Sequence, residues 1–348
     1  MVFATRLTEL FGIVQPLVLA PMPRHADARL ASAVCRAGGL GAFGAWRGLG
    51  IDEQYVRDTI AAIRRGTDQP FGAGFLTHDL PRSRSHLEVA LEEQVPAVLL
   101  SFEDPTPWIP LIHDGGARVL CQIQSRDHAR RAVDAGADAV CVQGVESGGH
   151  TGPLSLLPTL VWALETFPDT PILAAGGITN GRALAAVLGA GADGAWLGTA
   201  FLATREATFQ PSLAEAILNS DGTDTVRSKV IDVVMDNADP DRVPWLPHVA
   251  LRSQQNEFIE RWEGREAELA ADSAALSAAL RGLMKMDPTV MPMTFGEGAG
   301  AVNRQASVAD VVTAMTDDAH RLLARFSASP TPASEPQVDC RDRAQLRT

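Results

Sequence analysis

Short apolar segments that alternate with amphipathic stretches constrain the fold of this chain more than any other feature. The segments lie at 17–22, 40–44, 71–76, 96–102, 118–123, 139–144, 171–177 and 194–199. Each is apolar at nearly every position, which is typical of a strand buried on both faces of a parallel sheet. Glycine, serine, glutamine or proline gathers at their C-terminal ends. We therefore expect eight strands that end in turns or loops.

Helical stretches separate these segments. Apolar residues recur at intervals of three and four at 28–38, 52–66, 125–137 and 181–192, and several stretches end in glycine, as helices often do. Eight consecutive strand-then-helix units favour a (β/α)₈ barrel, the TIM-barrel fold of the α/β class. An open, doubly wound parallel sheet is the alternative, because the pattern does not establish that the sheet closes.

The pattern changes after residue 204. Further helical stretches follow at 212–220, 254–270 and 272–286, and a proline-containing stretch occupies 237–248. The expected division is a barrel over 1–204, a mostly helical accessory region on the substrate side over 205–290, a return to the barrel with a closing helix over 291–326, and a tail over 327–348. Because the tail is polar and rich in proline and serine, we expect it to be disordered.

Charge and hydropathy limit the expected partners and compartment. A net charge of −12 and a pI near 5.1 argue against nucleic acid or an anionic membrane surface, which both require basic patches. The N-terminus lacks the pattern of a secretory signal, and no segment approaches the ~18 apolar residues of a membrane span. We therefore expect a cytoplasmic protein. Cys35, Cys121, Cys141 and Cys340 show no paired spacing, so we expect reduced thiols, the first three in the core.

A histidine follows two glycines just after the sixth apolar segment, in "ESGGHTG". Catalytic groups of barrels lie on loops that follow the C-terminal ends of the strands. Gly148 and Gly149 permit positive φ and a close approach of the backbone to a ligand. The pattern favours His150 as a general base or hydrogen-bond donor, with a packing or solvent-facing histidine as the alternative.

Two glycine-containing turns follow the seventh and eighth segments. They contain Gly176 and Gly177 in "AAGGIT", and Gly198 and Thr199 in "LGT". The corresponding loops of barrels often bind phosphate through backbone N–H groups and a helix N-terminus, and Thr179 and Asn180 are placed to cap such a helix. Either turn alone would indicate only a change of chain direction. Together they favour a cofactor that carries phosphate.

Other candidate residues give weaker signals. Pro21 and Met22 follow the first segment and form a surface suited to a flat ring, with core packing as the alternative. His25 and His78 follow the first and third segments and are secondary candidates for the pocket wall. The sequence has no dinucleotide-binding glycine motif, P-loop, zinc motif or nucleophile elbow. The remaining histidines that we assign to the surface or to packing are His128, His248 and His320.

Taken in order, the motifs "LAPM", "AGGLGAFG", "VQGVESGGHTG", "AAGGITNGRALAAVLGAGADGAWLGTAFLAT" and "GEGAG" resemble the nitronate monooxygenase (2-nitropropane dioxygenase) family of FMN-dependent barrels. The FMN-dependent enoyl-ACP reductases of type II share most of these motifs. The resemblance runs over residues 10–325. It implies noncovalent FMN in the mouth of the barrel and His150 beside the substrate. The residues that it assigns to FMN are Pro21, Met22, Gln122, Gln143, Gly148, Gly149, Gly176, Gly177, Gly198, Thr199, Gly298 and Gly300.

Three positions depart from the family pattern. The monooxygenases usually carry asparagine where this chain has Gly74, lysine where it has Gln122, and glutamine where it has Glu297. Losing a lysine and gaining a carboxylate makes the expected flavin pocket less positive. The resemblance therefore fixes the family more firmly than the substrate.

The resemblance implies an enzyme that oxidises alkyl nitronates with O₂ to carbonyl compounds and nitrite. In this reaction His150 would orient the nitro group or remove the α-proton of a neutral nitroalkane. The first alternative is NAD(P)H-dependent reduction of an enoyl thioester, and the second is a barrel that binds a flavin without catalysis. The expected partners are a small-molecule substrate with O₂ or NAD(P)H. The oligomeric state is open, with a homodimer among the alternatives.

Overall fold

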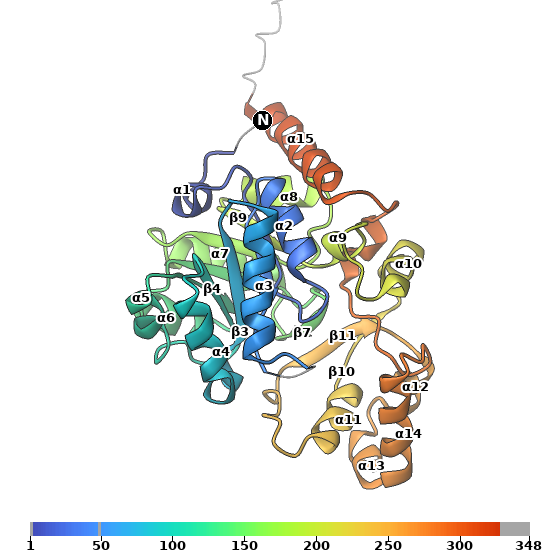
Figure 1. Cartoon of the computed structure of the whole chain (residues 1–348). Helices are drawn as coiled ribbons and strands as arrows, with labels where there is room; N and C mark the ends of the chain where they lie inside the picture. The colour runs from blue at the N-terminus through green and yellow to red at the C-terminus, as the bar shows by residue number, and fades with distance from the viewer. Residues whose placement is uncertain (1–2, 48–49, 328–348) are drawn as a thin grey trace, which may run out of the picture.

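The computed structural model describes residues 3–47 and 50–327 of the chain. Eight parallel strands form one sheet in the order β1-β9-β8-β6-β5-β4-β3-β2. Figure 1 shows the whole chain, with the helical region around α10 to α14 to one side of this sheet. A parallel bridge between Val18 and Leu40 joins β1 to the residue before β2 and brings the two ends of the sheet together. The predicted barrel is confirmed, and the open sheet is not what forms.

The predicted strands coincide closely with the observed ones. Their bounds are β1 (Leu17–Leu19), β2 (Gly41–Gly44), β3 (Phe71–Leu76), β4 (Ala97–Ser101), β5 (Arg118–Ile123), β6 (Ala139–Gln143), β8 (Ile172–Ala175) and β9 (Gly194–Leu197). The seventh and eighth strands of the barrel are therefore β8 and β9, because β7 lies outside it.

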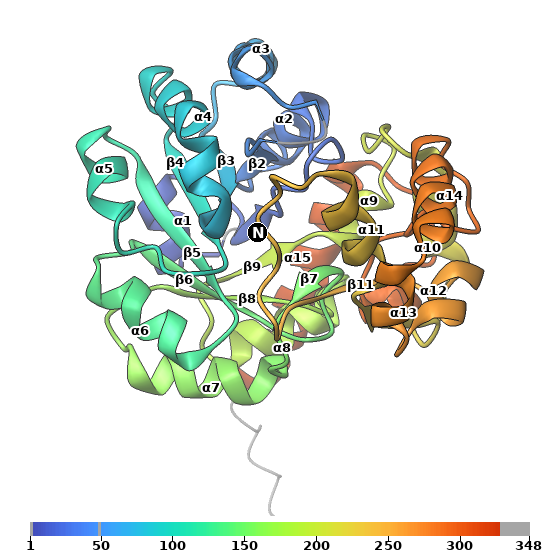
Figure 2. The ribbon, with the colours of Figure 1, turned by 90° about the horizontal axis from the view of Figure 1, so that it is seen from below.

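Helices cover the outside of the barrel, and in Figure 2 those from α2 to α7 surround the strands. Their bounds are α2 (Ala28–Arg36), α3 (Glu53–Gly66), α4 (Leu80–Glu92), α5 (Ile109–Asp114), α6 (Arg126–Asp134), α7 (Leu156–Thr166) and α8 (Gly181–Gly189). The sequence sets several starting points directly: Asp27, Asp52, Ser125 and Asn180 each accept a hydrogen bond from a backbone N–H of the first turn.

The core has an inner and an outer part because successive strand residues point to opposite faces. Val18, Leu99, Leu120 and Cys141 belong to the cluster inside the barrel. Their neighbours along the strands pack outward against the helices, and this outer cluster includes Cys121. Cys35, Cys121 and Cys141 are all buried, as the sequence predicted.

The N-terminal helix α1 (Arg6–Phe11) supplies Leu7 and Phe11 to the cluster inside the barrel. Its guanidinium anchor, Arg6, contacts both carboxylate oxygens of Asp193, at 2.9 and 2.7 Å. The same carboxylate accepts the backbone N–H of Ile172, at the first residue of β8. This contact ties the helix to the end of the barrel opposite the strand ends that carry glycine turns.

The accessory region contains strands as well as helices. The short helix α9 (Thr199–Leu202) follows β9 and still belongs to the barrel part of the chain. The elements of the accessory region are α10 (Pro211–Asn219), β10 (Thr225–Ser228), α11 (Val230–Ala238), β11 (Ala250–Gln254), α12 (Glu257–Trp262), α13 (Glu266–Ala271) and α14 (Ser273–Met284). β10 and β11 form an antiparallel sheet with β7 (Gly149–Thr151). The helical stretch predicted at 254–270 is divided because Gly264 adopts φ +73° between α12 and α13.

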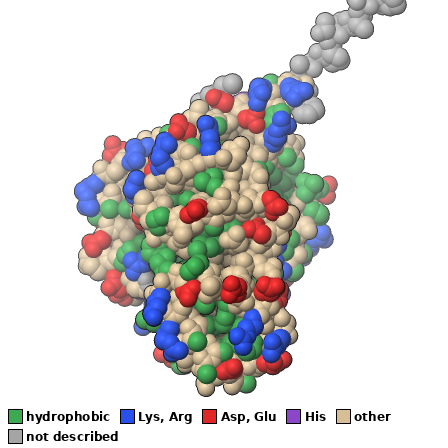
Figure 3. Space-filling view, turned by 90° about the vertical axis from the view of Figure 1, so that its right-hand side faces the viewer, with side chains coloured by type: hydrophobic (Ala, Val, Ile, Leu, Met, Phe, Trp, Pro, Cys, Tyr) green, Lys and Arg blue, Asp and Glu red, His purple; other side chains and the backbone are tan. Residues whose placement is uncertain are grey.

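The chain then returns to the barrel. A short 3₁₀ helix, η2 (Glu297–Ala301), precedes the closing helix α15 (Val308–Ser327), which packs on α8 and α2. Ser327, the first residue of the predicted tail, is the last residue of α15, and the rest of the predicted tail, 328–348, lies outside the described residues. On the face shown in Figure 3, acidic and basic side chains are interspersed among hydrophobic ones. No helix within 3–47 and 50–327 is long and apolar enough to cross a membrane.

Candidate active site

A cavity lies at the C-terminal ends of the barrel strands. Small-molecule sites of barrels occur at this end. Of the residues predicted to bind a cofactor, the cavity wall includes Met22, Gln122, Gln143, Gly148, Gly149, Gly176, Gly177, Gly198, Thr199 and Gly298. The structure thus brings together residues that are up to 276 positions apart, counted from 22 to 298.

Pro21 and Gly300 lie outside the cavity wall. The ring of Pro21 packs against Gly74, where an added Cβ would lie 2.2 and 2.3 Å from its carbon atoms. Gly300 instead packs against the backbone of Asp221, whose carbonyl oxygen would be 2.1 Å from a Cβ. Both residues shape segments next to the cavity, and neither lines it.

The turn after β8 combines two unusual backbone conformations. Gly176 has φ +113° and Gly177 has φ +67°, and both line the cavity. Asn180 caps the following helix α8 as predicted, whereas the Thr179 hydroxyl donates to the carbonyl of Gly298 at 2.8 Å. The turn therefore presents backbone and the beginning of a helix to one side of the cavity.

The turn after β9 lies against the same cavity. Thr199 accepts a hydrogen bond from the backbone N–H of Gly296 at 3.0 Å and so links this turn to the segment before η2. The backbone of Phe295 and Gly296 packs directly against Gly148. A Cβ at Gly148 would lie within 2.7 Å of that backbone. The C-terminal segment can therefore close one side of the cavity only because Gly148 lacks a side chain.

Buried polar atoms in the cavity wall lack partners within the described chain. They are the Ser147 hydroxyl oxygen and the Trp196 indole nitrogen. Buried polar groups are normally hydrogen-bonded, and an unpaired one costs free energy. The wall therefore fits a ligand that carries both hydrogen-bond donors and acceptors, which is the chemistry of a flavin.

Three glutamines form a chain of amides behind the cavity. The side-chain nitrogen of Gln124 lies 3.3 Å from the Gln122 oxygen and 3.0 Å from the Gln143 oxygen. Gln143 in turn donates to the backbone carbonyl of His150 at 3.0 Å. This chain fixes the amide orientation of Gln122, leaving its nitrogen as the group available to a ligand.

His150 lies in a strand, which corrects the prediction of a loop. It is the middle residue of β7 and pairs with Leu251 of β11. Its side chain is 17% exposed and is not part of the cavity wall, although Gly148 and Gly149 just before it are. The imidazole Nε2 lies 2.9 and 3.2 Å from the two carboxylate oxygens of Asp232, on α11.

An aromatic cluster covers the imidazole. The Trp245 ring stacks on His150 with 3.7 Å between centroids and 16° between planes. The rings of Phe102 and His78 pack against the same indole, with 4.8 and 4.7 Å between ring centroids. Burial, with smaller effects from His150 and Arg242, lowers the pKa of His78 to about 4, so this imidazole is neutral at pH 7.

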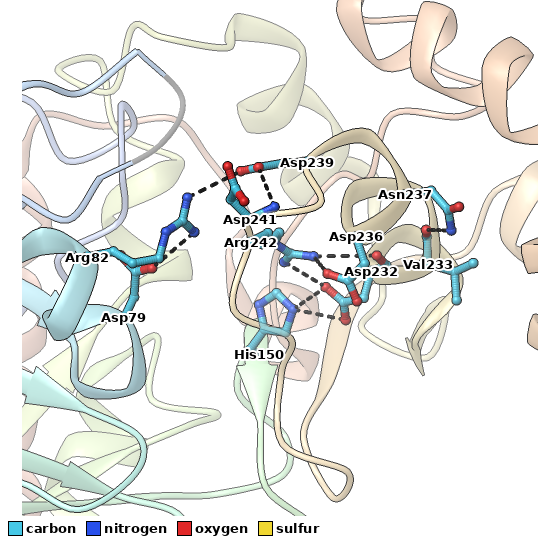
Figure 4. A network of polar contacts seen from close by, with 10 residues as sticks. All are labelled: Asp79, Arg82, His150, Asp232, Val233, Asp236, Asn237, Asp239, Asp241 and Arg242. Atoms are coloured by element: carbon cyan, nitrogen blue, oxygen red, sulfur yellow. Dashed lines mark hydrogen bonds and ion pairs between the residues drawn. The ribbon is translucent and has the colours of Figure 1, made fainter.

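A charged network surrounds Asp232, as Figure 4 shows. Arg242 contacts Asp232 at 3.2 Å and also pairs with Asp236. Burial disfavours the ionised Asp232, but His150 and Arg242 outweigh it and hold the pKa of this carboxyl below its usual value. Asp239 and Arg242 both lie on the loop that follows α11. A carboxylate oxygen of Asp239 lies 3.6 Å from a guanidinium nitrogen of Arg82, on α4, and this ion pair links the accessory region to the barrel.

Comparisons with known proteins agree with this geometry. The sequence profile of the family described as nitronate monooxygenase matches residues 4–82 and 82–318. The chain belongs to the nitronate monooxygenase family. Its members are oxidoreductases, and they include flavoenzymes.

Three relatives illustrate the range of the family. A Mycobacterium tuberculosis protein, (3aS,4S,5R,7aS)-5-hydroxy-7a-methyl-1-oxo-octahydro-1H-indene-4-carboxyl-CoA dehydrogenase, is 35% identical over 74% of this chain and 68% of its own. FabK from Thermotoga maritima aligns with a TM-score of 0.81 at 27% identity, over 93% of this chain and 99% of its own. Nitroalkane oxidase from Streptomyces ansochromogenes gives 0.76 at 26%, over 93% and 100%.

Two of the three departures from the family pattern, Gly74 and Glu297, have structural explanations. Gly74 has no room for a side chain because of Pro21. Glu297 is not in the cavity wall and forms an ion pair with Arg252 at 2.9 Å, so its charge is balanced outside the cavity. Gln122 does line the cavity. The expectation that the two replacements together make the pocket less positive stays a prediction.

The sequence reading missed Asp232 and Trp245. Asp232 occurs in the apolar run "VIDVV", and a carboxylate inside such a run is a sign of a buried, paired charge. Trp245 lay in the proline-containing stretch and carried no positional signal. The secondary candidate His25 packs edge-on against Phe209, outside the cavity wall, whereas His78 joins the aromatic cluster.

The other histidines lie away from the cavity. His128 is buried at α6, His320 stacks on Phe3, and His248 is exposed. Within the described residues no group of His, Cys, Asp or Glu is arranged to hold a metal ion.

Proposed function

We propose that this chain is an FMN-dependent enzyme that oxidises alkyl nitronates with O₂ to carbonyl compounds and nitrite. The observation that carries the proposal is the cavity itself: glycine turns from β8 and β9 meet there with unpartnered polar groups, next to a histidine paired with a carboxylate. Membership of the nitronate monooxygenase family and the similarity to nitroalkane oxidase support the choice of substrate.

The residues of the cavity suit FMN in particular. The backbone of Gly176, Gly177 and Gly198 would hold the phosphate, with the Thr199 hydroxyl beside it. Met22, Gly148 and Gly149 would lie along the ring, while Gln122, Gln143, Ser147 and Trp196 offer hydrogen bonds to its polar edge. When bound, a flavin supplies electron transfer that amino-acid side chains cannot perform.

The chain's own residues would bind and deprotonate the substrate. A nitro group makes the proton on its neighbouring carbon acidic, so an imidazole can remove it near neutral pH. His150 is the candidate base, and Trp245 and Phe102 would exclude water from this step. We propose residues 205–290 as the substrate-side region, because it contributes both Asp232 and Trp245.

A coenzyme A thioester is the second candidate substrate. It is favoured by the 35% identity to a carboxyl-CoA dehydrogenase, which exceeds the identity to nitroalkane oxidase. A thioester also acidifies the proton on its α-carbon, so the same base would serve. In the reductive direction, NAD(P)H would be the electron donor for an enoyl thioester.

One comparison of activities tests the proposal. Freshly purified protein should be yellow, and its released flavin should be FMN. Oxygen uptake and nitrite release with propyl nitronate are then compared with NAD(P)H consumption in the presence of crotonyl thioester. Nitrite release supports the first candidate. If flavin-loaded protein releases no nitrite at any nitronate concentration but consumes NAD(P)H with the thioester, the second candidate replaces it.

A further inference from the structure

A buried carboxylate from the accessory region holds one edge of the candidate base. Asp232 lies 82 residues from His150 in sequence, and its side chain is 8% exposed. Both of its oxygens are within 3.2 Å of Nε2. The backbone of His150 is fixed separately, by the β7–β11 pairing and by the hydrogen bond from Gln143.

This contact determines where the imidazole carries its proton. An ionised carboxylate only accepts hydrogen bonds, so Nε2 must be the donor. A neutral imidazole has one N–H, and the other nitrogen is then a lone-pair acceptor. In Figure 4 Nδ1 lies on the edge of the ring that faces away from Asp232. The free acceptor is therefore Nδ1.

The charges around Asp232 keep its carboxyl group ionised at neutral pH. Arg242, on the loop after α11, contacts Asp232 and stabilises its ionised form. Asp236 balances the charge of Arg242 from the same helix. His78 lies on the 3₁₀ helix η1 (Thr77–Asp79) and is neutral at pH 7. It therefore adds no positive charge that would compete with the imidazole of His150 for Asp232.

The ring is also fixed in orientation. Trp245 stacks on one face at 3.7 Å and holds the plane of the ring, and a 180° flip about the Cβ–Cγ bond would break the contact between Nε2 and Asp232. A histidine that served packing alone would not require a buried carboxylate, whose removal from water is costly. The arrangement is that of a base with a dedicated partner.

We propose that Asp232 is the positioning residue for His150: it holds the neutral imidazole as the Nε2–H tautomer so that Nδ1 accepts the α-proton of the substrate. Asp232 then stabilises the imidazolium that results, and it does so without touching the substrate. The use made of the proton rests on the proposed function, whereas the tautomer does not.

The tautomer is measured in the full-length protein without substrate. In ¹⁵N-histidine-labelled protein, with His150→Gln to assign the signal, the ring nitrogens are followed over a pH series, and we expect the neutral imidazole to carry its proton on Nε2 and none on Nδ1. The Nδ1–H tautomer in the unsubstituted protein would overturn the proposal.

Variants then test the consequence for turnover. Asp232→Asn keeps the shape and removes the charge, and we expect kcat to fall at least tenfold with KM within about threefold, together with a smaller share of the Nε2–H tautomer. Asp138→Asn is the matched control, because Asp138 also pairs with a histidine and an arginine, His113 and Arg118, but just before β6 and away from His150; it should leave tautomer and kcat near the unsubstituted values. Equal kcat and tautomer in Asp232→Asn and the unsubstituted protein would contradict the proposal.

The two hypotheses fail in different ways. If the flavin-loaded protein turns over neither nitronate nor thioester, the proposed function fails and the tautomer still decides the role of Asp232. If nitronate turnover is normal and the imidazole carries its proton on Nδ1, the function stands and the role of Asp232 is rejected.

Discussion

Gly177→Ala tests whether the turn after β8 holds a phosphate or only reverses the chain. Gly177 has φ +67°, and the nearest atom to an added Cβ would be the Glu146 Cγ at 3.5 Å, an ordinary contact. The cost in the free energy of unfolding is therefore the left-handed backbone alone, about 1–2 kcal/mol. Gly264 is the matched control: it has φ +73°, no atom lies within 4 Å of its Cβ position, and it lies between α12 and α13.

In urea denaturation, the free energy of unfolding of both alanine variants should fall by the same amount, about 1–2 kcal/mol. Only Gly177→Ala should weaken the binding of FMN, because its added methyl group would lie in the cavity wall. At this place the phosphate oxygens must approach backbone N–H groups to about 2.9 Å. We expect a rise in Kd of at least tenfold, which corresponds to about 1.4 kcal/mol.

The assay is a titration of flavin-free protein with FMN, followed by flavin fluorescence. Riboflavin, which lacks the phosphate, provides a second comparison: its binding should differ little between the two variants. If Gly177→Ala and Gly264→Ala bind FMN equally well, the turn after β8 does not contact the phosphate, and the placement of the cofactor must be revised.

Two further predictions concern stability and cofactor retention. Gly74→Asn restores the residue that the family usually carries, yet it should lower the free energy of unfolding by about 1–3 kcal/mol and weaken the binding of FMN, because any side chain must displace Pro21 beside the cavity. A thermal melt that also follows flavin release measures both effects. An unchanged melting temperature would show that Pro21 moves without cost. Burial lowers the pKa values of His25, His78 and His128 to about 4. Below pH 6.5 the unfolded chain binds more protons than the folded one, so each histidine should cost about 2 kcal/mol of stability at pH 5; urea midpoints at pH 7 and pH 5 test this, and His128→Gln should reduce the difference.

The barrel could be predicted from the sequence because each of its strands carries its own signal. A strand buried on both faces needs apolar residues at nearly every position, and this requirement is visible within six residues. The predicted 71–76 and 118–123 segments match β3 and β5 residue for residue. The cavity wall followed for the same reason: in a parallel barrel, residues just after the strands must meet at one end.

Elements stabilised by distant partners gave no such signal. β7 has three residues, and it is a strand only because β11 pairs with it from about a hundred positions away. α11 was not predicted, and with it the contact between Asp232 and His150 was missed. Sequence reasoning found the histidine and the glycines before it, but not the side chain that orients it.

The sequence by itself determined the fold class, the family and many of the residues at the mouth of the barrel, although Pro21 and Gly300 lie outside the cavity wall. Tertiary structure alone decided that His150 lies in a strand, that a buried carboxylate and an indole hold its ring, and that Gly74 is required by Pro21. The physical reason is range: burial and backbone preference are written in neighbouring residues, whereas the pairing of one imidazole with one carboxylate depends on where two separate segments meet in space.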